Sequence, residues 1–147
     1  MSWYTRTMKR EVFINVAVTD LEKSKAFFTA LGFAFDPRFT DEKAACLIVS
    51  EGSAYAMLLS VPFFESFLRD DDECADSDER EALFAISAED RIAVDELSAK
   101  ALSAGGKDYR TEDHGWMYAR AFKDIDGHVW EVFCMDPKGP PPEAPHA

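Results

Sequence analysis

The chain has 147 residues, is 47% hydrophobic and includes 12 phenylalanines. This length suits one domain, or two small halves that share a core. The 16 Lys and Arg residues stand against 28 Asp and Glu residues, so the net charge is −12. An acidic surface repels nucleic acid and anionic membranes, and we expect neither as a partner. No apolar run approaches the roughly 20 residues of a membrane span.

Three scattered cysteines, Cys46, Cys74 and Cys134, indicate the redox setting. They form no Cys-x-x-Cys motif and no Cys/His spacing typical of zinc. We therefore expect neither a disulfide framework nor a zinc knuckle, and a reducing cytoplasm is the expected location. Residues 1–10 are basic with no apolar stretch behind them, which does not predict a secretion signal.

Residues 11–61 predict the order strand, helix, strand, strand, strand. The β-branched run EVFINVAV at residues 11–18 is typical of a buried strand. The next segment predicts a helix near Leu21–Leu31, begun by a capping box of Thr19 and Glu22 and ended at Gly32. Three short strands are expected within residues 33–40, 44–51 and 54–61.

An acidic connector at residues 62–80 interrupts this order. A short helix is expected first, followed by the acidic run at residues 70–79. Two interpretations of this run are open, a solvated loop and a cation site. The run lacks the spacing and the loop glycine of an EF-hand, so it does not predict a calcium site.

The same order of elements recurs in residues 81–136. A strand at residues 82–89, a helix near Asp90–Ala104 and strands at residues 107–113, 117–124 and 128–135 are predicted. The residues of one helix face recur at a constant offset, Leu21, Ser24, Phe28 and Leu31 against Val94, Leu97, Ala101 and Ala104. The repeat predicts one α+β domain at residues 11–136, built from two βαβββ halves at 11–61 and 81–136. Residues 1–10 are an expected arm, and the Pro-rich residues 137–147 an expected disordered tail.

Two segments and the twofold βαβββ plan resemble the vicinal oxygen chelate superfamily. The segments are VTDLEKSKAFFTALGF at residues 18–33 and DIDGHVWE at residues 124–131. That superfamily includes glyoxalase I, extradiol dioxygenases, methylmalonyl-CoA epimerase and the bleomycin- and fosfomycin-resistance proteins. The chain is similar in particular to small bacterial proteins described as predicted lactoylglutathione lyase-like, through residues 39–46, 57–64 and 117–131. The resemblance covers about residues 11–136, and it implies a curled mixed sheet around a U-shaped cleft.

In metal-dependent members of that superfamily, four inward His, Glu or Gln side chains bind one divalent ion, which chelates the substrate or activates dioxygen. The resemblance places these positions at Phe13, Met57 (or Leu58), Leu83 and Glu131. A single carboxylate does not hold a hard divalent cation. We therefore predict no cofactor, disfavour a divalent metal, and expect metal-independent binding of a small organic molecule in the cleft. The alternative is a metal-dependent lyase, isomerase or dioxygenase with other ligands.

Glu131 is the candidate catalytic residue. A carboxylate facing an apolar cleft needs a cation, and Arg120 on the neighbouring strand is the predicted partner. Tyr118 shares the face of Arg120, and Asn15 shares that of Phe13. Three roles for Glu131 stay open: a structural pair with Arg120, a ligand anchor and a catalytic base. The predicted substrate-binding residues are Phe13, Asn15, Met57, Leu83, Tyr118 and Arg120.

The three histidines are not predicted to be catalytic. His114 and His128 are expected at the surface, and His146 lies in the tail. The aromatic run PFFESFL at residues 62–68 has little partner surface within one chain. An exposed apolar patch of this kind typically marks an interface, so we expect a homodimer.

Overall fold

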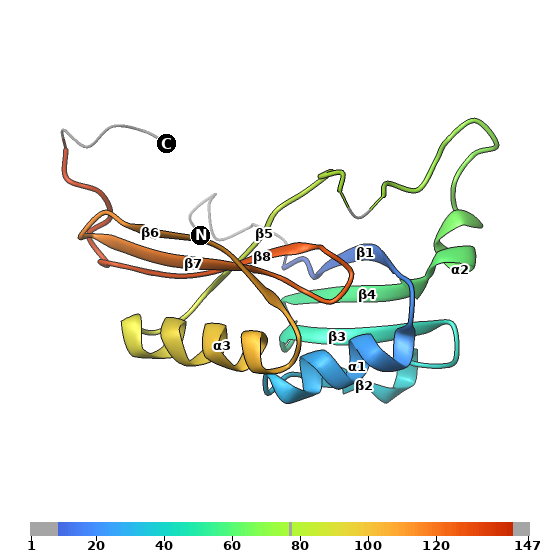
Figure 1. Cartoon of the computed structure of the whole chain (residues 1–147), viewed down its shortest axis with the longest axis horizontal. Coiled ribbons are helices and arrows are strands. Elements are labelled where there is room, and N and C mark those ends of the chain that lie inside the picture. Colours follow the sequence, from blue (N-terminus) through green and yellow to red (C-terminus); the bar gives the residue numbers. More distant parts are fainter. Residues whose placement is uncertain (1–8, 77, 143–147) are drawn as a thin grey trace, which may run out of the picture.

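The structure, a computed structural model, describes residues 9–76 and 78–142, and within them two βαβββ halves follow one another (Figure 1). The first half comprises β1 (Val12–Val18), α1 (Leu21–Ala30), β2 (Ala34–Asp36), β3 (Ala44–Ser50) and β4 (Ala54–Ser60), with a 3₁₀ turn at Pro37–Phe39. A short helix, α2 (Val61–Glu65), opens the connector. The second half comprises β5 (Phe84–Ser87), α3 (Arg91–Ser103), β6 (Lys107–Asp113), β7 (Met117–Lys123) and β8 (Val129–Met135). The predicted repeat is confirmed.

Each half forms a four-stranded mixed sheet. The strand orders are β1-β4-β3-β2 and β5-β8-β7-β6. In both sheets the first strand pairs in parallel with the last, and the other pairs are antiparallel. Helix α1 packs against β3 and β4, and α3 packs against β7 and β8. The predicted α+β class with two βαβββ modules is confirmed, and the strands form two separate four-stranded mixed sheets, each with a helix on one face.

Local sequence signals explain where the helices begin and end. Asp20 caps α1 by accepting from the Lys23 N–H at 3.1 Å, and Asp90 caps α3 by accepting from the Ala93 N–H at 2.8 Å. The predicted Thr19 capping box is wrong, because a long-range partner engages the Thr19 hydroxyl. Gly32 has φ +98°, a left-handed conformation that glycine adopts without strain after a helix end.

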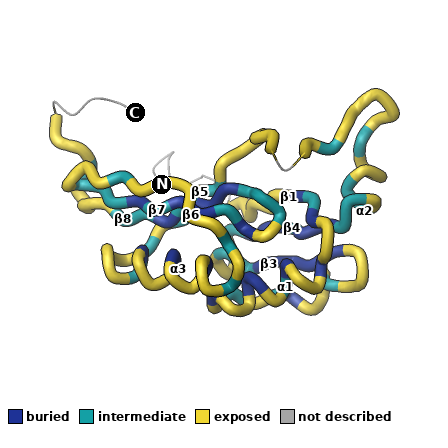
Figure 2. Tube along the Cα trace, viewed as in Figure 1, coloured by how far each residue is buried: buried dark blue, intermediate teal, exposed yellow. Residues whose placement is uncertain are grey.

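One hydrophobic core joins the two halves. The Phe28 ring of α1 lies 5.3 Å from the Trp130 ring of β8, and the Phe27 ring lies 6.3 Å from the Phe122 ring of β7. The buried residues in Figure 2 concentrate on the strands and on the inward faces of the helices, whereas the described connector residues are exposed or half-buried. Both halves contribute residues to this one cluster, so we expect the two halves to fold together.

The loop from Asp124 to His128 ties the second half to the first, and we call its contacts the interhalf clasp. The Asp126 carboxylate accepts from the Thr19 N–H at 2.8 Å, the Thr19 hydroxyl at 2.8 Å and the Ser24 hydroxyl at 3.0 Å. His128 Nε2 lies 2.7 Å from the Ala17 carbonyl oxygen and donates to it. His128 is half-buried, so its predicted exposed position is wrong. The DIDGH segment is therefore a joint between the halves.

Asp124 holds this loop in shape from inside. Its carboxylate accepts from the Trp130 indole N–H at 3.0 Å and from the backbone N–H groups of Asp126 and His128 at 2.9 and 3.0 Å. Burial raises the pKa of Asp124, while the nearby His128 and the three N–H donors act against that rise. These bonds fix the turn that presents Asp126 and His128 to the first half.

The segments outside the two halves carry little regular structure. Residues 137–142 contain neither helix nor strand, and the disordered tail stays a prediction. Residues 1–8 of the predicted arm, and 143–147 with His146, lie outside the described residues. Within the described ranges, no helix has the length and apolar character needed to cross a membrane.

Candidate functional site

Four of the predicted site residues lie on the sheet faces that the helices leave uncovered. Val16, Leu58 and Val132 belong to the helix-facing core, and strand side chains alternate between the two faces. Phe13, Asn15, Met57 and Glu131 therefore point to the helix-free faces. The Phe13 ring stacks on Tyr55 with 4.7 Å between centroids. Leu83 directly precedes β5 and is 61% exposed.

These faces carry few groups that could hold a metal. Of the four positions that the resemblance assigns to metal ligands, three hold Phe13, Met57 and Leu83, which offer no oxygen or imidazole donor. Glu131 pairs across the β7–β8 ladder with Ala121, which offers none either. Among the described residues, no group of three or more His, Cys, Asp or Glu side chains is arranged to bind a metal ion. The residues present do not fit the metal centre of the metal-dependent relatives.

The predicted pair between Arg120 and Glu131 is wrong. The β7–β8 register places Arg120 opposite Val132, which faces α3, and Glu131 opposite Ala121, so the two side chains lie on opposite faces of the sheet. The Arg120 guanidinium lies 3.6 Å from Asp95 on α3 and 3.8 Å from Asp108 on β6. Strand alternation alone did not reveal which face of this sheet the helix covers.

Tyr118 is likewise part of a polar network beneath α3. Its hydroxyl donates to Asp95 at 2.6 Å, and this hydrogen bond raises the pKa of Tyr118. The Arg91 guanidinium lies 4.6 Å from the centroid of the Tyr118 ring and binds both carboxylate oxygens of Asp113, at 2.7 and 2.8 Å. That bidentate contact lowers the pKa of Asp113 well below its usual range. These residues brace α3 against β6 and β7.

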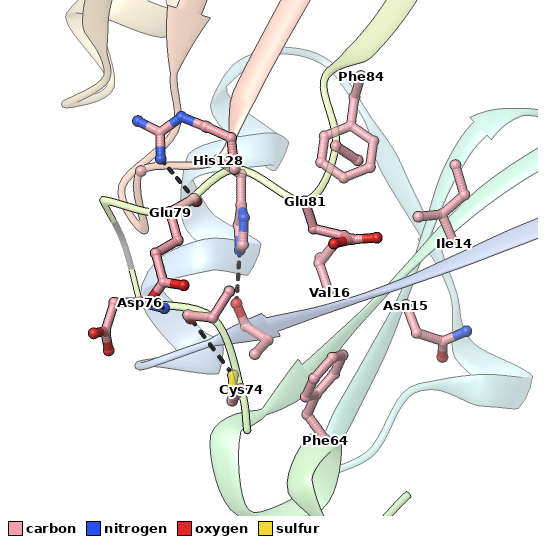
Figure 3. Close-up of a pocket in the computed structure, with 15 residues that line it drawn as sticks. Ile14, Asn15, Val16, Phe64, Cys74, Asp76, Glu79, Glu81, Phe84 and His128 are labelled. Carbon is pink, nitrogen blue, oxygen red and sulfur yellow. Dashed lines mark hydrogen bonds between the residues drawn. The ribbon is translucent and has the colours of Figure 1, made fainter. Parts of the chain in front are cut away.

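A cavity of about 170 Å³ lies elsewhere, along the outer edge of β1 and beneath the connector. We call it the connector pocket, and Figure 3 shows it in close-up. It brings together segments far apart in the sequence. Its lining includes Ile14, Asn15 and Val16 of β1, Phe64 of α2, Phe84 of β5 and His128 of the interhalf clasp, with connector residues that close it from outside.

The edge of β1 also offers backbone groups to this pocket. The Val12 N–H donates to the Ser53 carbonyl beside β4, so the even-numbered residues of this parallel strand direct their N–H and C=O groups toward β4. The odd-numbered residues direct theirs to the outer edge. At that edge His128 donates to the Ala17 carbonyl, and Asn15 is among the residues that line the pocket.

Of the predicted substrate-binding residues, only Asn15 lines the connector pocket. Sequence reasoning missed Phe64, Glu81, Phe84 and His128 as pocket residues. They come from three separate segments, and no local pattern indicates where the connector crosses β1. The DIDGH segment was the one usable signal, because it marked His128 as part of a conspicuous turn.

The sequence matches one family model over part of its length. Residues 10–50 match the model of the bleomycin resistance protein-like N-terminal family. Among curated proteins, none matches the sequence significantly.

Solved structures resemble the chain over most of its length. A hypothetical protein from S. aureus is 25% identical, with 90% of this chain and 99% of that chain covered and a TM-score of 0.71. A glyoxalase-related enzyme from Fulvimarina pelagi is 20% identical, with coverage of 86% and 88% and a TM-score of 0.70. TnmS3, an antibiotic binding protein from Streptomyces, is 17% identical, with coverage of 88% and 98% and a TM-score of 0.62. The chain thus has the vicinal oxygen chelate fold, and its N-terminal match and structural neighbours support membership of the vicinal oxygen chelate superfamily of glyoxalases, bleomycin-resistance proteins and dioxygenases.

Proposed function

We propose that the protein binds a small organic molecule without a metal ion, and that the connector pocket is the binding site. The observation that carries this proposal is the cavity of about 170 Å³ with a mainly apolar lining and a few polar groups. Ligand sites typically have this composition. An apolar cavity of about 150 Å³ is large enough to hold benzene, so the connector pocket suits a molecule with a single ring.

Metal independence is supported by the chemistry of the helix-free faces. Phe13, Met57 and Leu83 stand where the resemblance implies metal ligands, which leaves Glu131 as the one donor among the four positions. The structural neighbour TnmS3 is an antibiotic binding protein, which agrees with a binding role. The free cysteines agree with a reducing cytoplasm as the location, which is part of the proposal.

A metal-dependent lyase, isomerase or dioxygenase is the second candidate. Two observations favour it: Glu131 points to a helix-free face, and a glyoxalase-related enzyme is among the structural neighbours. Under this alternative a second copy of the chain supplies further ligands to Glu131. Elemental analysis of protein purified without chelator decides between the two candidates. Stoichiometric Ni, Zn, Fe or Mn that is lost in Glu131→Ala would overturn metal independence.

Binding is tested by thermal unfolding in the presence of a library of single-ring metabolites. Ala82 lines the connector pocket and is exposed, so we expect a larger side chain there to narrow the cavity without removing a core contact. We expect Ala82→Leu to abolish the ligand-induced rise in Tm. Ala85→Leu is the matched control, because Ala85 is also exposed but does not line the pocket.

A different result would place the site on the helix-free faces. Phe13 is 46% exposed there and lies outside the connector pocket. A ligand-induced rise in Tm that survives Ala82→Leu but is lost in Phe13→Ala would overturn the proposed location. A parent protein that no library member stabilises would count against the binding function itself.

A further inference from the structure

We propose that the ligand of the connector pocket is an organic cation, an amine or quaternary ammonium group attached to a small apolar body. This inference rests on the proposed binding function and names its ligand class. Three features of the pocket support this ligand class: its negative charge, a carboxylate without a partner among the described residues, and two aromatic rings.

The charge of the pocket favours a cation. Three carboxylates, those of Asp76, Glu79 and Glu81, line it against one guanidinium, that of Arg80. The whole chain carries a net charge of −12, so the surrounding surface does not reverse this preference. A cleft lined by one sign of charge concentrates ligands of the opposite sign. An anionic ligand would be repelled at this position.

Glu81 is the carboxylate available to such a ligand. In Figure 3 its side chain extends into the pocket toward Ile14, below the Phe84 ring and above the Phe64 ring. Within the described part of the chain, the Glu81 carboxylate accepts no hydrogen bond and forms no ion pair. Glu79 differs, because its carboxylate accepts from the Asp76 N–H at 3.2 Å. An ammonium group beside Glu81 would therefore displace no existing partner.

The other lining groups complete a site for an ammonium ion on an apolar body. The rings of Phe64 and Phe84 offer π faces, to which cations are attracted. Asn15 at the β1 edge offers carbonyl oxygens, which accept hydrogen bonds from an ammonium N–H. Ile14 and Val16 provide apolar contact for the body of the ligand. A neutral ligand would use the apolar contacts but would leave Glu81 unused.

The test compares three probes of nearly equal size, benzylammonium, benzyl alcohol and benzoate, by NMR titration of the isotopically labelled full chain. We expect benzylammonium to bind most tightly, to shift the backbone resonances of Ile14, Phe84 and His128, and to bind more weakly as salt is raised. Benzoate should bind most weakly. For a solvent-accessible ion pair assisted by aromatic rings, Glu81→Gln should weaken benzylammonium binding about three- to tenfold and leave benzyl alcohol binding unchanged.

Glu73→Gln is the matched control. It removes the same charge a few residues earlier in the chain, within the connector, yet Glu73 does not line the pocket, so benzylammonium binding should not change. Equal affinities for the three probes, or equal effects of the two glutamate variants, would overturn the cation preference and leave the binding function standing. If no probe shifts the pocket resonances, the cation inference fails. If the metabolite library also fails to stabilise the parent protein, the proposed function fails with it.

Discussion

Asp126 should contribute more to the free energy of unfolding than its half-buried position suggests, because its side chain joins the two halves. In Asp126→Ala three donors lose their acceptor: the Thr19 N–H, the Thr19 hydroxyl and the Ser24 hydroxyl. Water can replace the carboxylate at Thr19, which is exposed, so those two bonds should account for about 0.5 kcal/mol each. Ser24 is 1% exposed, and its unsatisfied hydroxyl should cost a further amount of about 1–2 kcal/mol. We expect a total loss of about 2–3 kcal/mol.

The assay is urea denaturation followed by tryptophan fluorescence and circular dichroism, with the free energy of unfolding extrapolated to water. Asp136→Ala is the control, because among the described residues the Asp136 carboxylate accepts only from the Lys138 N–H within its own turn. In a double-mutant cycle, Asp126→Ala and Ser24→Ala should show a coupling free energy of about 1 kcal/mol. A loss in Asp126→Ala no larger than that in Asp136→Ala would refute the clasp, and the aromatic core alone would then hold the halves together.

The substitutions Arg120→Ala and Glu131→Gln should have additive effects on the free energy of unfolding, because the two side chains lie on opposite faces of the β7–β8 pair. A coupling free energy above about 0.5 kcal/mol in a double-mutant cycle would contradict that placement. Arg91 depresses the pKa of Asp113, so the stability from this pair is complete above the unfolded-state pKa of about 3.9 and is lost as the pH falls below it. Asp113→Asn should therefore flatten the decline of unfolding free energy between about pH 4 and pH 2, and an unchanged acid slope would argue against the pair. We expect the chain to form a homodimer, because apolar side chains such as Phe13 and Phe67 are 46% and 69% exposed. A monomer mass by light scattering at micromolar concentration would disprove the homodimer.

The sequence by itself determined the order of the secondary-structure elements and the repeat, although a 3₁₀ turn at Pro37–Phe39 replaces the end of the strand predicted within residues 33–40. Alternation and helical periodicity depend on neighbours a few residues apart, so the strand at residues 107–113 and the two helices follow from local signals. The same logic correctly separated Glu131 from its strand neighbours Trp130 and Val132, which belong to the core. The family motifs, also local, led to the correct fold class.

Only the tertiary structure decided which partners these side chains meet. Alternation shows that Arg120 and its neighbours divide between two faces, but α3 determines which face is covered, and its Asp95 takes the place predicted for Glu131. Thr19 looks like a helix cap by its spacing, yet its hydroxyl binds Asp126, which is 107 residues away in the sequence. The connector pocket forms where residues 74–76 and 79–82 lie along the edge of β1. Such long-range contacts depend on how the two halves pack, and no local pattern of residues encodes that packing.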